Sequence, residues 1–304
     1  MPFAQSNDSL AKIRPVGRAG HGTVFYPQRS GRAAAPLAIS VLATLLLSGA
    51  LRAQSDWPYP GRDPAATRYS PLAQINTRNV TRLKRAWTFH TGDPGANVNS
   101  EGAPLVVDGV MYLVAGKNVF ALNPETGEQI WKYETKGTQR RGLSYWPGDA
   151  QTAPRLFLGV AGKQMLALGA KTGQPAAGFG DDGFVAGDAP SSAPVIYKNL
   201  VITGDNGVQM IRAWDARTGK LVWTFYTKVQ PGEPGHETWK GASFDVKSGT
   251  DVWTFMTLDA ERGLVFAAIA PSGGNEYYGG LRLGNAIYSD SLVALDANTG
   301  KLMW

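Results

Sequence analysis

A 14-residue segment recurs four times along the chain and limits its fold more than any other feature. The copies read NVFALNPETGEQIW (118–131), QMLALGAKTGQPAA (164–177), MIRAWDARTGKLVW (210–223) and SLVALDANTGKLMW (291–304). Their Thr-Gly glycines are 46, 46 and 81 residues apart, and three copies carry tryptophan four residues after the glycine. A weaker earlier copy, NVTRLKRAW (79–87), contributes Trp87.

Each copy is typical of a strand that ends in a tight turn and is followed by a second strand. The turn needs glycine where φ is positive, and Asp or Asn to accept hydrogen bonds from the turn amides. Hairpin signals precede the copies, as in PLVVDGVMYLV (104–114) and APVIYKNLVIT (193–203). Four strands in about 45 residues is the period of a propeller blade. The sequence therefore predicts an all-β chain, a β-propeller of four-stranded blades with tryptophan-docking repeats.

Two long segments interrupt this pattern. Residues 228–250 (KVQPGEPGHETWKGASFDVKSGT) are too polar and too rich in Gly and Pro for strands, and residues 271–286 form a second Gly-rich segment. Long loops inside compact domains are usually functional. We expect both loops on one face, where the blade loops converge.

The positive charge of the chain is concentrated at its N-terminus. The formal net charge is +6, but residues 1–53 carry six basic side chains and one acidic side chain, so the remainder is nearly neutral. The uncharged run PLAISVLATLLLSGA (36–50) suits a signal-peptide core, with cleavage after Ala50 or Ala53. The alternative is an uncleaved membrane anchor. The sequence predicts a signal peptide or N-terminal anchor over 1–53, a propeller domain over 54–304, and export to the periplasm.

Several chemistries are excluded by what the sequence lacks. There is no cysteine, which excludes disulfides, thiolate metal sites and a cysteine nucleophile. The G-x-G-x-x-G, Walker A and G-x-S-x-G motifs are absent, and the three histidines are far apart in the sequence. The neutral body gives no support to nucleic-acid binding.

Five further stretches identify a family that the repeat resembles. They are DWPYPGRDPAATRYSPLAQINTRNVTRLKRAWTFHTGD (56–93), RRGLSYWPG (140–148), PGEPGHETWKG (231–241), SGTDVWTFMTLDAERGLVF (248–266) and YYGGLRLGNAIYSDSLVALDANTGKLMW (277–304). With the repeat A-x-D-x-x-T-G-x-x-x-W, they resemble the pyrroloquinoline-quinone (PQQ) dehydrogenases, most closely the glucose (sugar) branch. The resemblance covers residues 56–304.

The resemblance implies PQQ as cofactor and assigns roles to individual residues. Arg141 matches the arginine that pairs with PQQ carboxylates, and Trp253 the tryptophan on which the quinone stacks. Ser191 matches a hydroxyl that hydrogen-bonds PQQ, and Asp251 another cofactor-contacting position. His236 matches a loop histidine near the cofactor and is the one candidate catalytic residue.

The family also uses a divalent cation, Ca²⁺ or Mg²⁺, and an Asp carboxylate that removes the substrate hydroxyl proton. This sequence departs from the alcohol branch at those positions. The loop after Gly204 lacks the metal-binding Glu, Pro271 replaces a metal-binding Asn, and Asn285 replaces the catalytic Asp. An amide is no general base at neutral pH, so Asn285 cannot be the base. The sequence therefore identifies neither the base nor the metal ligands.

The resemblance implies oxidation of a glucose-like sugar or an alcohol, with electrons passing to a quinone or cytochrome acceptor. The family propeller has eight blades, whereas the 251 residues after the leader allow about five at about 45 residues each. We therefore expect the N-terminal part of a quinoprotein. The alternative function is a non-catalytic periplasmic scaffold that binds envelope proteins through its blade loops.

Overall fold

The computed structural model describes residues 56–92, 101–138, 141–187, 190–204, 207, 209–240, 249–272 and 283–304. The leader predicted over residues 1–53 lies outside this part of the chain. Within it, no helix is both long and apolar enough to cross a membrane.

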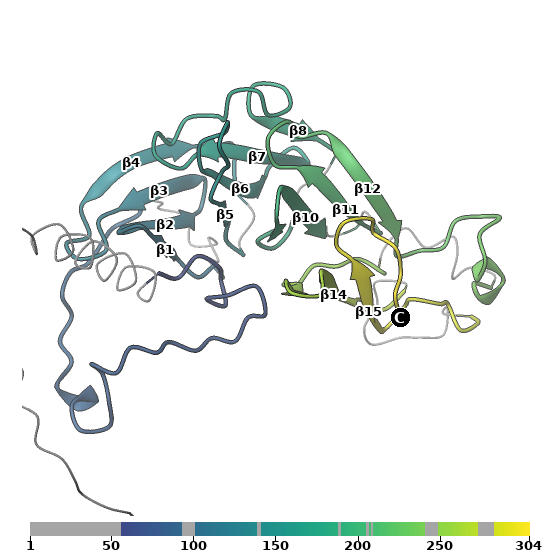
Figure 1. Ribbon diagram of the computed structural model, residues 1–304, viewed down its shortest axis with the longest axis horizontal. Helices are drawn as coiled ribbons and strands as arrows, with labels where there is room; N and C mark the ends of the chain where they lie inside the picture. Colours follow the sequence, from purple (N-terminus) through teal and green to yellow (C-terminus); the bar gives the residue numbers. More distant parts are fainter. Residues whose placement is uncertain are drawn as a thin grey trace, which may run out of the picture. The chain divides into compact units, whose positions relative to one another are not determined.

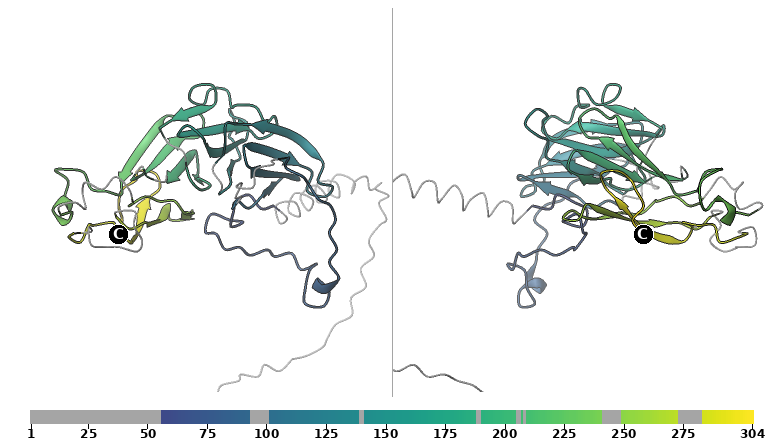
Figure 2. Two further views of the ribbon diagram at one scale, coloured as in Figure 1. Left: turned by 180° about the vertical axis from the view of Figure 1, so that it is seen from behind. Right: turned by 45° about the vertical axis from the view of Figure 1, so that its right-hand side comes forward.

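The described chain is built of antiparallel strands arranged in four sheets, which follow one another in chain order (Figure 1, Figure 2). Blade 1 holds β1 (Leu105–Val107), β2 (Val110–Ala115), β3 (Asn118–Leu122) and β4 (Gln129–Glu134). Blade 2 holds β5 (Ser144–Trp146), β6 (Arg155–Val160), β7 (Gln164–Gly169) and β8 (Phe184–Ala186). Blade 3 holds β9 (Val195–Tyr197), β10 (Leu200–Gly204), β11 (Met210–Asp215) and β12 (Leu221–Tyr226). Blade 4 holds β13 (Thr257–Asp259), β14 (Leu264–Ile269) and β15 (Ser291–Asp296).

Each sheet is a meander in which consecutive strands pair, so the first strand is innermost in its blade. Innermost strand β9 contacts β5 on one side and β13 on the other. The remaining elements are two 3-10 turns, η1 (Val80–Arg82) and η2 (His236–Thr238). This is the predicted all-β propeller architecture, and both predicted hairpins are present as β1–β2 and β9–β10.

The apolar core lies between successive sheets. One cluster joins blades 1 and 2, a second joins blades 2 and 3, and a third joins blades 3 and 4. Inner strands such as β6 are buried along their whole length, because a neighbouring blade covers each face. The outer strand β4 instead alternates between exposed and half-buried residues.

Docking tryptophans join the segment that contains Trp87 to blade 1, blade 1 to blade 2, and blade 3 to blade 4. An ideal Cβ placed on Gly127 would lie 2.6 Å from the Trp87 ring, so only glycine leaves room for this contact. The Trp87 Nε1–H also donates to the carbonyl of Pro124, at 3.1 Å. The same pair of contacts recurs twice, with Trp131 on Gly173 and Ala170, and with Trp223 on Gly300 and Ala297.

The junction between blades 2 and 3 uses different residues, because Ala177 stands where the repeat has its tryptophan. The Phe179 ring and Val185 cover Gly219 in place of an indole. The buried Arg155 guanidinium donates to the carbonyls of Ala216, Arg217 and Ala177. An arginine and a phenylalanine thus take over the two contacts that a docking tryptophan makes elsewhere.

The second strand expected after each Thr-Gly turn forms in blades 1 and 3. In blade 2 the residues after Gly173 form only the bridge Leu168–Pro175, and the outer strand is β8, further along the chain. In blade 4 a bridge between Leu295 and Leu302 stands at the corresponding place.

The two long loops contact each other, and their predicted place on the face where the blade loops converge stays a prediction. Lys240 of the first loop bridges to Leu283 of the second. The Thr238 carbonyl accepts from the Ala286 amide at 2.9 Å, and the Thr238 hydroxyl accepts from the Ile287 amide at 3.0 Å. Residues 241–248 and 273–282 lie outside the described part of these loops.

Candidate functional site

Side chains predicted to bind the cofactor lie in equivalent loops of successive blades. Arg141 stands three residues before β5, Ser191 four residues before β9, and Trp253 four residues before β13. Glu101 occupies the same place four residues before β1. Because β9 contacts both β5 and β13, these loops meet at one end of the innermost strands.

Arg141 and Trp253 are in direct contact. The Arg141 guanidinium carbon lies 4.9 Å from the centre of the Trp253 ring, within the range of a cation–π interaction. Its Nε donates to the Glu101 carboxylate at 2.9 Å. The Arg141 side chain is 20 % exposed, whereas Trp253 remains 39 % exposed. Trp253 precedes its strand rather than lying on it, so its indole is not part of a blade core.

Two serines fix the backbone of the Trp253 loop. The Ser191 hydroxyl, on a residue only 4 % exposed, donates to the Trp253 carbonyl at 3.3 Å. The Ser192 hydroxyl donates to the Thr254 carbonyl at 2.8 Å. Ser192 also forms a parallel bridge with Arg141. The serine loop therefore links the arginine and tryptophan loops.

Asp251 is a buried carboxylate on the same loop as Trp253. It is 5 % exposed, and its Oδ2 accepts a hydrogen bond from the Gly207 amide at 2.9 Å. Its carbonyl accepts from the Ala270 amide at 3.0 Å. Asp251 therefore links the β10–β11 loop of blade 3 to the residue that follows β14 in blade 4.

His236 belongs to a different segment, the loop that follows β12. It is half-buried and begins η2, where its amide donates to the Glu233 carbonyl and its carbonyl accepts from the Trp239 amide. The contacts described above unite Arg141, Ser191 and Trp253, while His236 takes part in none of them.

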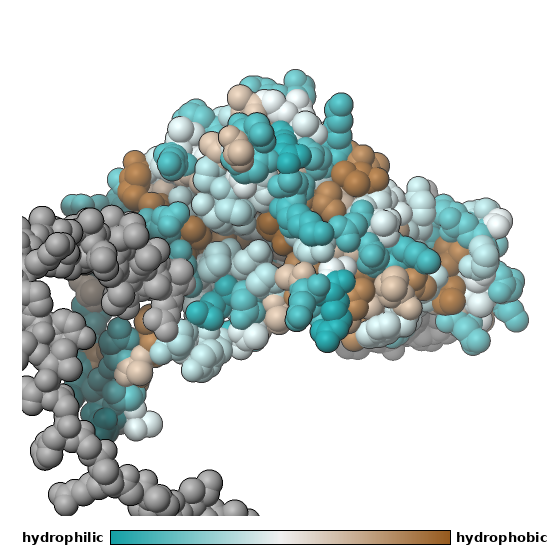
Figure 3. Space-filling model, viewed as in Figure 1, coloured by the Kyte–Doolittle hydropathy of each residue, from teal (hydrophilic) through white to brown (hydrophobic). Residues whose placement is uncertain are grey.

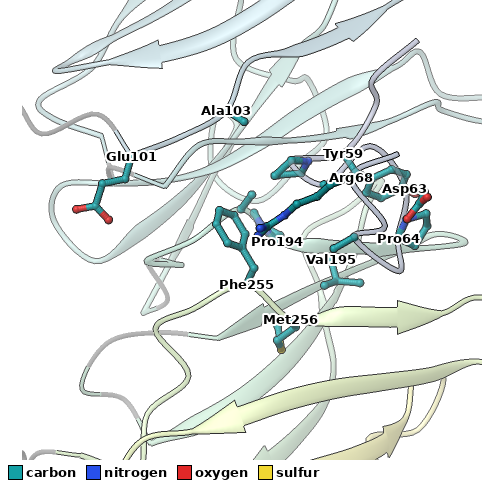
Figure 4. Close-up of a pocket in the computed structure, with 14 residues that line it drawn as sticks. Tyr59, Asp63, Pro64, Arg68, Glu101, Ala103, Pro194, Val195, Phe255 and Met256 are labelled. Atoms are coloured by element: carbon teal, nitrogen blue, oxygen red, sulfur yellow. The ribbon is translucent and has the colours of Figure 1, made fainter. Parts of the chain in front are cut away.

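A cavity of about 280 Å³ adjoins these loops (Figure 4). One wall is formed by the segment from Tyr59 to Arg68, and the other by Glu101, Ala103, residues 193–195 and residues 255–256. Figure 4 shows the Arg68 side chain directed toward Phe255, with Glu101 set apart on the other side. Burial raises the pKa of the Tyr59 phenol in this wall, so this phenol stays protonated at neutral pH. Glu101 is common to the cavity and to the Arg141 ion pair.

The fold and the site together define a tryptophan-docked β-propeller with an arginine, an exposed indole and a serine presented by successive blades. The family model for PQQ, described as "Glucose/ethanol/alcohol dehydrogenase, beta-propeller domain", matches residues 57–304. The chain belongs to this family of PQQ-dependent dehydrogenases.

Curated relatives include both alcohol and glucose dehydrogenases. The dehydrogenase subunit of a quinone-dependent alcohol dehydrogenase from Gluconobacter oxydans is 32% identical over 291 residues, covering 82% of this chain and 37% of the relative. Quinoprotein glucose dehydrogenase A from Acinetobacter calcoaceticus is 29% identical, covering 83% of this chain and 37% of the relative. The chain therefore spans well under half the length of these relatives.

A solved structure supports the same assignment. The quinohemoprotein alcohol dehydrogenase of Pseudomonas putida HK5 superposes with a TM-score of 0.69 at 28% identity, over 83% of this chain and 40% of that one. The prediction of the family and of its propeller fold is confirmed.

The residues present suit a planar, polycarboxylated quinone. Arg141 offers a guanidinium for a carboxylate, Ser191 a hydroxyl, and Trp253 an exposed aromatic face. The guanidinium now rests on that face, so a stacked quinone has to displace it or take the opposite face. A metal site is less developed, since the described residues hold no group of three or more His, Asp or Glu side chains.

Glu101 and Ser192 were not among the residues singled out from the sequence. Glu101 lies outside the repeats, and its neighbours EGAPLVV suggest only the start of a strand. Like Ser191 and Trp253, Glu101 stands four residues before the first strand of its blade. A comparison of equivalent positions in successive blades could therefore have identified it.

Proposed function

We propose that the chain forms part of a PQQ-dependent dehydrogenase that oxidises a hydroxyl group of a sugar or an alcohol. The observation that carries this proposal is the Arg141–Trp253 contact at the meeting point of the blade loops, anchored by Ser191. Bound PQQ would supply a two-electron acceptor that no side chain can provide. The cofactor, the divalent cation and the site residues all belong to this proposal.

The chain's own residues would bind and orient the cofactor. Arg141, which is paired with Glu101 and lies over the Trp253 ring, would supply its guanidinium to a cofactor carboxylate. Trp253 would offer its indole face to the quinone, and the Ser191 hydroxyl would hold the Trp253 backbone in place through its hydrogen bond to the Trp253 carbonyl. The loop that contains His236 borders the site's second long loop and is the candidate for contact with the substrate.

A sugar is the favoured substrate. The chain lacks the adjacent cysteines of the alcohol branch, and Pro271 and Asn285 replace residues on which that branch depends. We assign the chain to the periplasm on the signal-like run 36–50, which would alternatively anchor it to the inner membrane. A periplasmic quinoprotein passes its electrons to a quinone or a cytochrome, and these are the proposed partners.

The test is a dehydrogenase assay on the purified chain with PQQ, Ca²⁺ or Mg²⁺ and an artificial electron acceptor. We expect dye reduction with an aldose, weaker reduction with short alcohols, and loss of activity in Arg141→Ala. Because the chain spans under half the length of its relatives, a folded chain that neither reduces the dye nor binds PQQ would contradict the proposal and favour the scaffold function.

A further inference from the structure

We propose that the cavity bounded by the entry segment (residues 56–68) binds a small aromatic or other apolar monocarboxylate, with Arg68 as the anchor of its carboxylate (Figure 4). The inference goes beyond the proposed function, because the described residues that line this cavity include neither Arg141 nor Trp253. Only Glu101 belongs both to the cavity wall and to the cluster around Arg141.

Backbone contacts hold the entry segment against two different blades. Trp57 and Val106 of β1 exchange both of their backbone hydrogen bonds, at 2.7 and 3.0 Å. Further along the segment, the Pro64 carbonyl accepts from the Leu258 amide of β13 at 2.8 Å. Because main-chain hydrogen bonds tie the segment to blade 1 and to blade 4, the cavity is largely pre-formed, as ligand pockets usually are.

The backbone of the entry segment is strained on the side of the cavity. Three residues other than glycine have left-handed backbone, with φ of 78° at Arg62, 55° at Ala66 and 55° at Arg68. Such conformations are uncommon outside glycine, and they cluster at functional sites and ligand clamps. The Arg68 amide donates to the Gly61 carbonyl at 2.9 Å, which closes this turn. Figure 4 shows that the Arg68 side chain then points toward Phe255.

Arg68 brings to the cavity a charge for which the described residues hold no partner. Its side chain forms no ion pair or hydrogen bond with any of them. The two carboxylates in the wall are already engaged, since Asp63 accepts from the amide and hydroxyl of Thr67, and Glu101 from Arg141. A guanidinium pairs best with a carboxylate, through two parallel hydrogen bonds. The cavity therefore has an unused donor for an anion.

The wall opposite the entry segment is apolar. Phe255 and Met256 precede β13, and Pro194 and Val195 lie at the start of β9. Phe255 is 38% exposed, so its ring is accessible to an aromatic ligand. The cavity volume of about 280 Å³ lies near the lower end of the roughly 300–1,000 Å³ of ligand pockets. One ring with one carboxylate suits both this size and this chemistry.

Saturation-transfer NMR with benzoate tests the inference, with benzamide as its neutral counterpart. The purified chain is titrated with each compound in the absence of PQQ. We expect saturable binding of benzoate and weaker binding of benzamide. Arg68→Gln should lower the benzoate affinity about tenfold and change the benzamide affinity little, because only the carboxylate loses a charged hydrogen bond.

The matched control is Arg62→Gln, which should bind benzoate as the wild type does. It removes the same charge from the same segment, again at a left-handed residue, but Arg62 does not line the cavity. Trp253→Ala should also leave benzoate binding unchanged, since its indole is not part of the cavity wall.

The inference is overturned if the folded wild type binds no benzoate saturably, if folded Arg68→Gln keeps its affinity, or if Arg62→Gln loses as much. A loss of benzoate binding in Trp253→Ala would place the compound at the cofactor loops and would also overturn it. If Arg68→Gln does not fold, Ala103→Leu decides, because it adds bulk to the cavity wall at an exposed residue. Unchanged affinity there overturns the inference. PQQ quenching of tryptophan fluorescence in the same variants reports the proposed function separately.

Discussion

An indole ring covers a docking glycine at two junctions between blades and also where Trp87 packs on blade 1. Gly127, Gly173 and Gly300 have φ angles of 75°, 67° and 71°, and each lies under a tryptophan ring. The positive φ disfavours any other residue, and the ring leaves no space for a side chain. Two separate physical constraints therefore select the same amino acid.

Substituting one of these glycines separates the two constraints. Gly173→Ala should lower the free energy of unfolding by about 2–4 kcal/mol, from backbone strain together with overpacking against Trp131. Gly109→Ala is the matched control, because its φ is +75° but no atom lies within 4 Å of the added Cβ. In urea unfolding of both variants, the control should lose about 1 kcal/mol in its free energy of unfolding. Equal losses would mean that the indole contact adds nothing.

The site residues show how far a sequence can predict single positions. Family motifs pointed to Arg141, Ser191 and Trp253, and the structure brings these three together. Glu101 was missed because its role depends on a loop 40 residues away along the chain, which no local pattern encodes. The role predicted for His236 stays a prediction.

Strand periodicity and turn chemistry predicted the hairpins β1–β2 and β9–β10 and the strands that lead into the Thr-Gly turns. Asp296 shows why the turns are readable: burial opposes its ionisation, but hydrogen bonds from Asn298 and Thr299 outweigh this and lower its pKa. The expected strand directly after the Thr-Gly turn is absent in blade 2 and is reduced to a bridge in blade 4. In blade 2 the chain first places Phe179 against the next blade, and β8 follows. The position of this segment is set by packing against Gly219 of blade 3, and the periodicity of the segment itself carries no information about that contact.

We expect the hydrogen bonds of Arg155 to be the main polar contacts that stabilise the junction between blades 2 and 3. Arg155→Leu leaves up to three backbone carbonyls without a donor, and we expect a loss of about 3 kcal/mol in the free energy of unfolding. Arg262→Leu removes an exposed arginine paired with Asp259 and should cost less than about 1 kcal/mol. Chemical denaturation of the two variants provides the comparison. A loss in Arg155→Leu no larger than in Arg262→Leu would contradict this role.

At the scale of the whole described chain, the sheets depend on one another more than on any single core. The three largest apolar clusters each span two blades, so stability is built up junction by junction, as in other repeat proteins. On the face shown in Figure 3, hydrophobic groups are separated by hydrophilic residues. The loops of the candidate site depend on the same arrangement, because each of four successive blades supplies one of the residues Glu101, Arg141, Ser191 and Trp253.

The central claim is that these blades jointly form a PQQ site, and a fluorescence titration with PQQ tests it most directly. We predict saturable quenching that disappears in Trp253→Ala and persists in Trp304→Ala, whose tryptophan is 60% exposed and lies on the last blade. Arg141→Ala should weaken binding roughly 10- to 100-fold, as expected for a lost charged hydrogen bond. Quenching that survives in Trp253→Ala, or a folded chain that PQQ does not quench, would contradict the account.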